Sequence, residues 1–206
     1  MPRPALTRAR LLGLDRSGPP PPQTEPDAPL RPWTIPNAIG YARAALIPVI
    51  LILEYRSAHG TDVAPAMCFF VAGAGDYLDG IVARATGQYS RMGSLLDPVV
   101  DRLLAVAGLA VCWSYELLPR WLVALVLARE ALMLVLGQAW VRRGMPVRIN
   151  WPGRIAVGPT LFGIWMALLG VRDVAEGFVL AGVALALLAT VVYVRDGRRQ
   201  FRRASP

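Results

Sequence analysis

Residues 75–104 read GDYLDGIVARATGQYSRMGSLLDPVVDRLL and place acidic side chains between two apolar segments. The four carboxylates are Asp76, Asp79, Asp97 and Asp101. A charged side chain at the centre of a membrane helix costs about 2.5–3.5 kcal/mol on insertion scales. An apolar chain is therefore expected to keep four such residues only where something compensates their charge.

The rest of the sequence is apolar enough for a membrane protein. Of its 206 residues 55% are hydrophobic, and the mean hydropathy is +0.44; soluble domains are about 45–50% apolar. All 22 basic residues are arginines, and the net charge is +8. These arginines cluster beside apolar segments, which favours a membrane surface as their partner and predicts no nucleic-acid partner.

Six apolar segments approach the length of about 20 residues that crosses a bilayer. The expected spans are Ile39–Leu53, Val63–Val82, Leu95–Ser114, Trp121–Val141, Ile155–Val171 and Val174–Val194. Sixteen arginines fall in the terminal tails and in the loops on the same side, against three in the opposite loops. Because cytoplasmic loops carry the positive excess, we expect an all-α integral membrane protein with six transmembrane helices and both termini in the cytoplasm.

Composition divides the chain into three parts. Residues 1–35 are rich in proline and arginine and lack the apolar residues needed for a core, so we expect a disordered cytoplasmic tail. Residues 36–195 are expected to form the six-helix domain. Residues 196–206 are expected to form a basic C-terminal tail.

Helical spacing brings the acidic residues onto common faces. Asp76 and Asp79 are three positions apart, so they differ by about 60° around a helix. Gly93, Asp97 and Asp101 follow one another at steps of four, which gives a stripe with about 40° between neighbours. The predicted topology places both pairs of carboxylates at the cytoplasmic end of two consecutive antiparallel helices.

A cation must compensate this group of carboxylates. All-oxygen ligands suit Mg²⁺ first and Mn²⁺ next, and neither histidine nor cysteine occurs in the stretch to suggest zinc. Glycine at positions 80 and 93 would let a ligand or a backbone approach closely. The alternative is that the aspartates form ion pairs that only hold helices together; the candidate partners are Arg43, Arg84, Arg102 and Arg129.

The complete motif resembles the signature of a known enzyme family. It reads Asp76-x2-Asp79-Gly80-x2-Ala83-Arg84-x8-Gly93-x3-Asp97-x3-Asp101. This pattern is similar to that of the CDP-alcohol phosphotransferases, integral membrane enzymes of phospholipid synthesis, and the similarity extends over about residues 34–194.

The resemblance implies roles for the matching residues. Asp76, Asp79 and Asp97 would bind two divalent ions, Mg²⁺ or Mn²⁺. Asp101 would act as the general base and could also contact a metal. The nucleotide site would be lined by Gly80, Ala83, Arg84 and Gly93, with Arg84 on the diphosphate, where its planar fork can form paired hydrogen bonds.

The start of the first expected span, TIPNAIGYARAALIPV, resembles the phosphatidylglycerophosphate synthase and cardiolipin synthase branches of this family. Asn37 and Arg43 would face the nucleotide on this interpretation. Alternatively, Arg43 extends to the lipid headgroups. Arg129 and Glu130 lie in the middle of the fourth span and are expected to face the bundle interior, either supporting the site or joining helices.

The resemblance implies transfer of the phosphatidyl group from CDP-diacylglycerol to an alcohol, with release of CMP. Glycerol-3-phosphate is the expected acceptor, and Arg148 and Arg154 are candidates for binding its phosphate. A cardiolipin synthase that uses phosphatidylglycerol is the first alternative, and a cation transporter is a distant one. The family also implies a homodimer in contact with membrane lipids, and we expect its active site at the cytoplasmic face of a bacterial cytoplasmic membrane.

Overall fold

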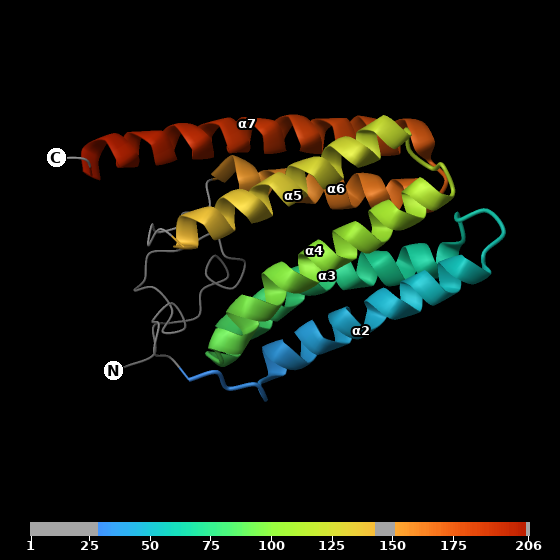
Figure 1. Ribbon diagram of the computed structural model, residues 1–206. Coiled ribbons are helices and arrows are strands. Elements are labelled where there is room, and N and C mark those ends of the chain that lie inside the picture. Colours follow the sequence, from blue (N-terminus) through green and yellow to red (C-terminus); the bar gives the residue numbers. More distant parts are fainter. Residues whose placement is uncertain (1–28, 143–150, 205–206) are drawn as a thin grey trace. The chain divides into compact units, whose positions relative to one another are not determined.

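The computed structural model describes residues 29–142 and 151–204 of the chain. The regular structure of these residues is helical throughout, which confirms the all-α prediction for the described part (Figure 1). Its six helices are α2 (Ile35–Arg56), α3 (Val63–Thr86), α4 (Arg91–Ser114), α5 (Arg120–Arg142), α6 (Trp151–Leu168) and α7 (Arg172–Ala204).

Three segments of the described helices are long and apolar enough to cross a membrane. They are Ile35–Arg56, Val63–Thr86 and Arg172–Val191, and α6 adds the shorter apolar segment Ala156–Leu168. Helices α4 and α5 each contain four charged residues, which lowers their mean hydropathy. The prediction of six spans therefore stays a prediction for these two helices and for α6.

The helix ends differ from the expected spans mainly at the polar borders. Helix α2 begins four residues before the expected span and ends three residues after it. Helix α7 continues through most of the segment expected to be a basic tail and ends at Ala204. Arginine favours helix about as well as leucine does, so a basic segment can extend a preceding apolar helix.

The described helices belong to two compact units. The first contains α2, most of α3 and residues 91–107 of α4; the second contains residues 57–63, the end of α4 and helices α5–α7. All four aspartates of the motif lie in the first unit. In the second unit α6 and α7 run side by side, and the rings of Phe162 and Phe178 meet edge to face with centroids 4.6 Å apart.

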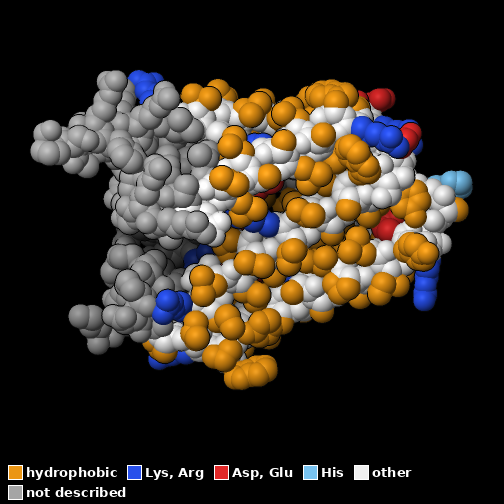
Figure 2. Space-filling view, viewed as in Figure 1, with side chains coloured by type: hydrophobic (Ala, Val, Ile, Leu, Met, Phe, Trp, Pro, Cys, Tyr) orange, Lys and Arg blue, Asp and Glu red, His pale blue; other side chains and the backbone are white. Residues whose placement is uncertain are grey.

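Apolar side chains form both the core of the first unit and its outer surface. Ile50, Phe69 and Leu104 are fully buried between α2, α3 and α4. Leu78 and Leu103 point outward and are about half exposed, whereas Asp79, next to Leu78, is buried. Figure 2 shows hydrophobic side chains along the helices where a soluble protein would expose charge. This arrangement suits helices surrounded by lipid.

Side-chain caps fix the ends of α2 and α4 that lie near the acidic residues. Thr34 Oγ1 accepts a hydrogen bond from the Asn37 backbone N–H at 3.3 Å, and Ser90 Oγ accepts one from the Gly93 N–H at 3.0 Å. Both are N-cap interactions, which satisfy backbone donors in the first helical turn. The four-residue loop 87–90 joins α3 to α4, so the C-terminal part of α3 lies beside the N-terminal part of α4.

Candidate active site

Three of the four motif aspartates meet at one buried arginine. Arg43 lies on α2, and its side chain is only 2% exposed. Its Nη1 atom lies 3.3 Å from Asp76 Oδ1 and 3.1 Å from Asp79 Oδ2, and its Nη2 atom donates to Asp101 Oδ1. Its Nε atom donates to the backbone carbonyl of Ala72 at 2.8 Å. One guanidinium therefore links α2 to both acidic helices.

The helical spacing explains why these carboxylates converge. Asp76 and Asp79 lie three residues apart on α3, and Asp97 and Asp101 lie four residues apart on α4. The prediction that each pair of aspartates lies on one helix is thus confirmed. Side-chain exposure rises from 7% at Asp79 through 28% at Asp101 to 49% at Asp76. The cluster is therefore buried at Asp79 and open to its surroundings at Asp76.

The position of Arg43 rules out one of the two interpretations of its side chain. A guanidinium that is 2% exposed does not extend to the lipid headgroups, so the headgroup interpretation is wrong. The ion pairs of the alternative interpretation are present between Arg43 and three of the aspartates. Arg129 instead pairs with its neighbour Glu130. A single arginine cannot balance four carboxylates, because one positive charge faces up to four negative ones.

Asp97 completes the acidic group from the side of α4. It is half-buried and is not among the three aspartates that Arg43 contacts. A Cβ atom at Gly40 on α2 would lie 4.0 Å from Asp97 Oδ1 and 2.8 Å from Leu96 Cδ2, so α2 and α4 approach closely at this level.

The donor chemistry of the cluster fits a hard divalent cation, although Arg43 occupies its centre. Within residues 29–142 and 151–204, no three Asp, Glu, His or Cys side chains are grouped as ligands of one metal ion. The carboxylate oxygens are nevertheless the ligand type that Mg²⁺ and Mn²⁺ prefer. Three of them already converge on a cation, the guanidinium of Arg43.

Sequence reasoning missed Gly75, which makes room for this arginine. A Cβ atom at position 75 would lie 2.7 Å from Arg43 Cδ and 2.8 Å from Arg43 Cγ, closer than real Cβ contacts. Gly75 directly precedes Asp76, so α3 has no side chain in the path of Arg43 beside its first carboxylate. A glycine four residues before Asp79 and beside Asp76 was the available signal, because the spacing of four puts it on the face of Asp79.

Asn37 and Gly93 form a tie between the start of α2 and the start of α4. The Asn37 amide donates to the carbonyls of Arg31 and Pro32 at 3.0 Å each, and its oxygen accepts from Ser90 Oγ at 2.8 Å. A Cβ atom at Gly93 would lie 2.8 Å from that oxygen. The sequence predicted that a ligand or a backbone approaches Gly93 closely. In the structure the side chain of Asn37 makes this approach. A contact of either residue with nucleotide stays a prediction.

The other predicted nucleotide residues lie along the last turns of α3. The Arg84 guanidinium reaches back over Gly80, where a Cβ atom would lie 3.4 Å from its nearer Nη atom. Ala83 is half-buried beside it. The last turns of α3 therefore carry these three predicted nucleotide residues close in sequence to Asp76 and Asp79.

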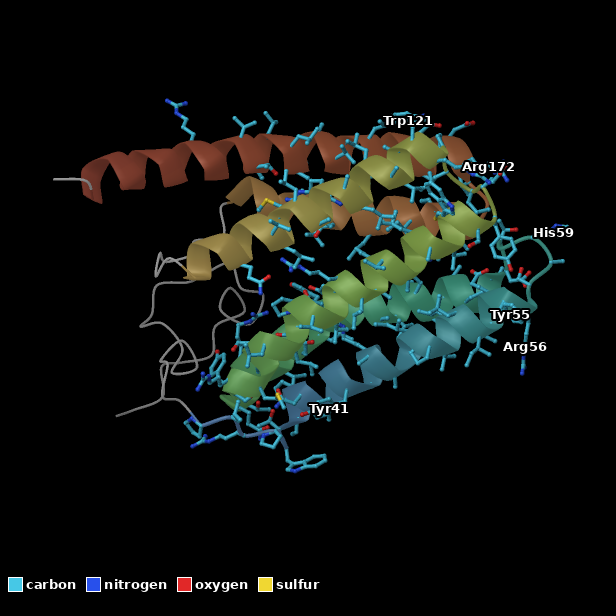
Figure 3. All side chains as sticks on the ribbon, in the orientation of Figure 1. Tyr41, Tyr55, Arg56, His59, Trp121 and Arg172 are labelled. Carbon is cyan, nitrogen blue, oxygen red and sulfur yellow. The ribbon has the colours of Figure 1, made fainter. Side chains whose placement is uncertain are left out.

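The two arginines predicted to bind the acceptor phosphate lie where the structure describes no side chain. Arg148 lies outside the described residues, and Arg154 is the fourth residue of α6, with a side chain that is likewise not described. His59 is exposed in the loop that follows α2, whereas Tyr41 marks the N-terminal half of that helix (Figure 3).

Comparison with known proteins identifies the family of this cluster. The family model described as CDP-alcohol phosphatidyltransferase matches residues 33–193, which include the whole acidic motif. The chain belongs to this family. The match agrees closely with the range expected from the motif.

Named bacterial proteins are similar over most of the chain. The CMP-forming cardiolipin synthase of Streptomyces coelicolor is 35% identical over 185 residues, which are 84% of this chain and 86% of that protein. The CDP-diacylglycerol–glycerol-3-phosphate 3-phosphatidyltransferase of Bacillus subtilis is 29% identical over 66% of this chain and 77% of that protein. The protein of the same name from Pectobacterium atrosepticum is 26% identical over 77% of this chain and 89% of that protein.

Family membership settles the class of the protein. It is a phosphatidyltransferase and hence an enzyme, so the cation-transporter hypothesis is set aside. Together with three long apolar helices, membership identifies an integral membrane protein. Members of this family generally use divalent metal ions.

Proposed function

We propose that this protein transfers the phosphatidyl group of CDP-diacylglycerol to an alcohol hydroxyl and releases CMP. The convergence of Asp76, Asp79 and Asp101 from two helices, inside the region that matches the family, supports this proposal most strongly. In the reaction the hydroxyl oxygen forms a bond to the phosphatidyl phosphorus. The bond from that phosphorus to the oxygen of CMP breaks, and the hydroxyl proton moves to a base.

Asp101 is the proposed base. Its side chain is 28% exposed, so an acceptor hydroxyl can reach it from outside the cluster. Arg43 donates a hydrogen bond to Asp101 Oδ1, so Oδ2 is the oxygen proposed to receive the hydroxyl proton. A positioned carboxylate base typically contributes a factor of about 10²–10⁴ to the rate.

Asp76, Asp79, Asp97 and Asp101 are the residues proposed to hold two divalent ions, Mg²⁺ or Mn²⁺. When bound, such ions stabilise negative charge on the diphosphate as the phosphorus–oxygen bond to CMP breaks. Arg84 is proposed to bind the same diphosphate, and Gly80 and Ala83 leave space beside it. Asn37 and Gly93 are proposed to border the nucleotide through the tie between α2 and α4.

The acceptor is proposed from the similar proteins. The higher identity and coverage of the Streptomyces cardiolipin synthase favour phosphatidylglycerol, with cardiolipin as the product. Glycerol-3-phosphate is the second candidate, because proteins named for that acceptor also match and because basic residues lie before α6 and in its first turn. Arg148 and Arg154 remain the proposed ligands of an acceptor phosphate.

The membrane arrangement is proposed from the distribution of arginines. Six spans with both termini in the cytoplasm place the ends of α2, α3 and α4 that carry the cluster near the cytoplasmic face. At that depth the acyl chains of CDP-diacylglycerol can stay in the bilayer while the cytidine nucleotide stays in water. We also propose a bacterial cytoplasmic membrane and a homodimer, and we keep the division into a tail of residues 1–35, a domain of residues 36–195 and a basic end of residues 196–206.

The test is CMP release by purified protein in detergent micelles that contain CDP-diacylglycerol and MgCl₂ or MnCl₂. Phosphatidylglycerol, glycerol-3-phosphate and no acceptor are supplied in separate reactions. We expect CMP and cardiolipin with phosphatidylglycerol. If CMP release depends on glycerol-3-phosphate instead, glycerol-3-phosphate is the acceptor. If neither alcohol stimulates CMP release, both proposed acceptors are wrong.

A further inference from the structure

Arg43 uses every part of its guanidinium within the first unit. Nε binds the Ala72 carbonyl, Nη1 binds Asp76 and Asp79, and Nη2 binds Asp101. The side chain is 2% exposed. A buried arginine with four partners on two other helices has a fixed position, because moving it would leave several charged groups without partners.

The helix beside Arg43 is shaped to receive it. Gly75 offers no side chain at the point where the Cγ and Cδ atoms of Arg43 cross α3, and a Cβ atom there would lie 2.7–2.8 Å from them. Gly73, two residues earlier on the same helix, has only ordinary contact, with Leu104 Cδ2 at 4.0 Å from a Cβ position. The close fit is therefore specific to the path of Arg43.

Electrostatics gives this fit a consequence. Asp76, Asp79 and Asp101 share one cation, and without that cation they would repel one another across α3 and α4. A bound divalent ion would attract the same carboxylate oxygens and so would also reduce their repulsion. Arg43 and a metal ion therefore compete for the carboxylates, and each can replace part of what the other contributes to their convergence.

We propose that Arg43 is a resident counter-cation of the acidic cluster. It holds Asp76, Asp79 and Asp101 together before divalent ions bind, and it weakens the affinity of the cluster for those ions. Arg43 is a positioning residue in this role, because it acts through the carboxylates. The role of the ions in catalysis rests on the proposed function, but the effect of Arg43 on ion binding and stability does not.

The first test compares Arg43→Gln with the unchanged protein in detergent. Thermal unfolding is followed by tryptophan fluorescence in EDTA and during titration with MnCl₂. We expect Arg43→Gln to unfold at a lower temperature in EDTA and to bind Mn²⁺ about tenfold more tightly, which is about 1.4 kcal/mol. At saturating Mn²⁺ the gain in melting temperature should then be about 3–6 °C larger in the variant than in the unchanged protein.

A purely structural arginine gives a different result. Its loss would lower the melting temperature equally in EDTA and in Mn²⁺, and the gain from Mn²⁺ would be the same in both proteins. That result would overturn the proposal.

The second test leaves every charge in place and does not depend on how well Arg43→Gln folds. Gly75→Ala should displace the Arg43 side chain, whereas Gly73→Ala adds the same methyl group to the same helix without touching it. We expect the enlarged Mn²⁺ response in Gly75→Ala alone. Equal Mn²⁺ responses in the two alanine variants would count against the proposal.

These results are separable from the proposed reaction. If the unchanged protein releases no CMP but the Mn²⁺ responses differ as expected, the reaction is wrong and the role of Arg43 stands. If CMP is released normally and the Mn²⁺ responses do not differ, the role of Arg43 is wrong and the reaction stands.

Discussion

Gly93→Ala should weaken the tie between α2 and α4, and its magnitude follows from the contacts of the new methyl group. The added Cβ atom would lie 2.8 Å from Asn37 Oδ1 and 3.2 Å from Ser90 Oγ. Asn37 cannot easily withdraw, because its amide is held by two carbonyls at 3.0 Å and the residue is 2% exposed.

Several small terms set the size of the effect. Losing the buried hydrogen bond from Ser90 to Asn37 costs about 1–3 kcal/mol, and disturbing the Ser90 cap costs about 1 kcal/mol. The substitution also stabilises the helix by up to about 1 kcal/mol, because alanine has a higher helix propensity than glycine. The net destabilisation is therefore about 1–3 kcal/mol, or a fall in melting temperature of about 2–12 °C for a chain of this size.

The assay is thermal unfolding in detergent at one fixed heating rate, with Gly158→Ala as the matched control. Gly158 lies within α6, and a Cβ atom there would meet nothing within 4 Å. The control should be as stable as the unchanged protein or slightly more stable. If Gly93→Ala unfolds at the same temperature as Gly158→Ala, the reasoning about the tie is refuted.

Two further predictions concern activity. Asp101→Asn should lower the rate of CMP release at saturating substrate by about 10²–10⁴-fold, because asparagine cannot accept the hydroxyl proton. Mn²⁺ and CDP-diacylglycerol should still bind in equilibrium measurements, because Asp76, Asp79 and Asp97 remain as proposed metal ligands. Loss of binding together with an unchanged maximal rate would exclude Asp101 as the base. His59→Ala should leave CMP release within about twofold of the unchanged protein, since His59 is exposed in the loop after α2 and lies outside the acidic motif. A tenfold loss in the same assay would give His59 a role in the reaction.

The sequence predicted the helices and the acidic faces because both depend on local periodicity. Asp76, Asp79, Asp97 and Asp101 lie on helices as their spacing required. The end of α7 was harder to predict, because arginine neither ends a helix nor enters the hydrocarbon readily, so composition alone suggested a tail where the helix continues.

The sequence offered Arg43 as one of four candidate partners of the aspartates, but residue spacing could not select it, nor could it predict the tie at Asn37. Both join residues more than 30 positions apart, as in Arg43 with Asp79 and Asn37 with Ser90. Such contacts depend on how close two helices approach, which the missing side chains of Gly75 and Gly93 determine. The role of such a glycine in packing can be recognised only when the residue that packs against it from the other helix is known.

The most direct measurement of the central claim is CMP release from CDP-diacylglycerol by Asp79→Asn and by Glu116→Gln in the presence of Mg²⁺. Asp79 is the most buried carboxylate of the cluster, whereas Glu116 is exposed and pairs with Arg120. The account predicts loss of about 10²-fold or more in Asp79→Asn and an unchanged rate in Glu116→Gln, with both proteins folded by thermal unfolding. Normal CMP release by a folded Asp79→Asn protein would contradict the claim that these carboxylates form the catalytic centre.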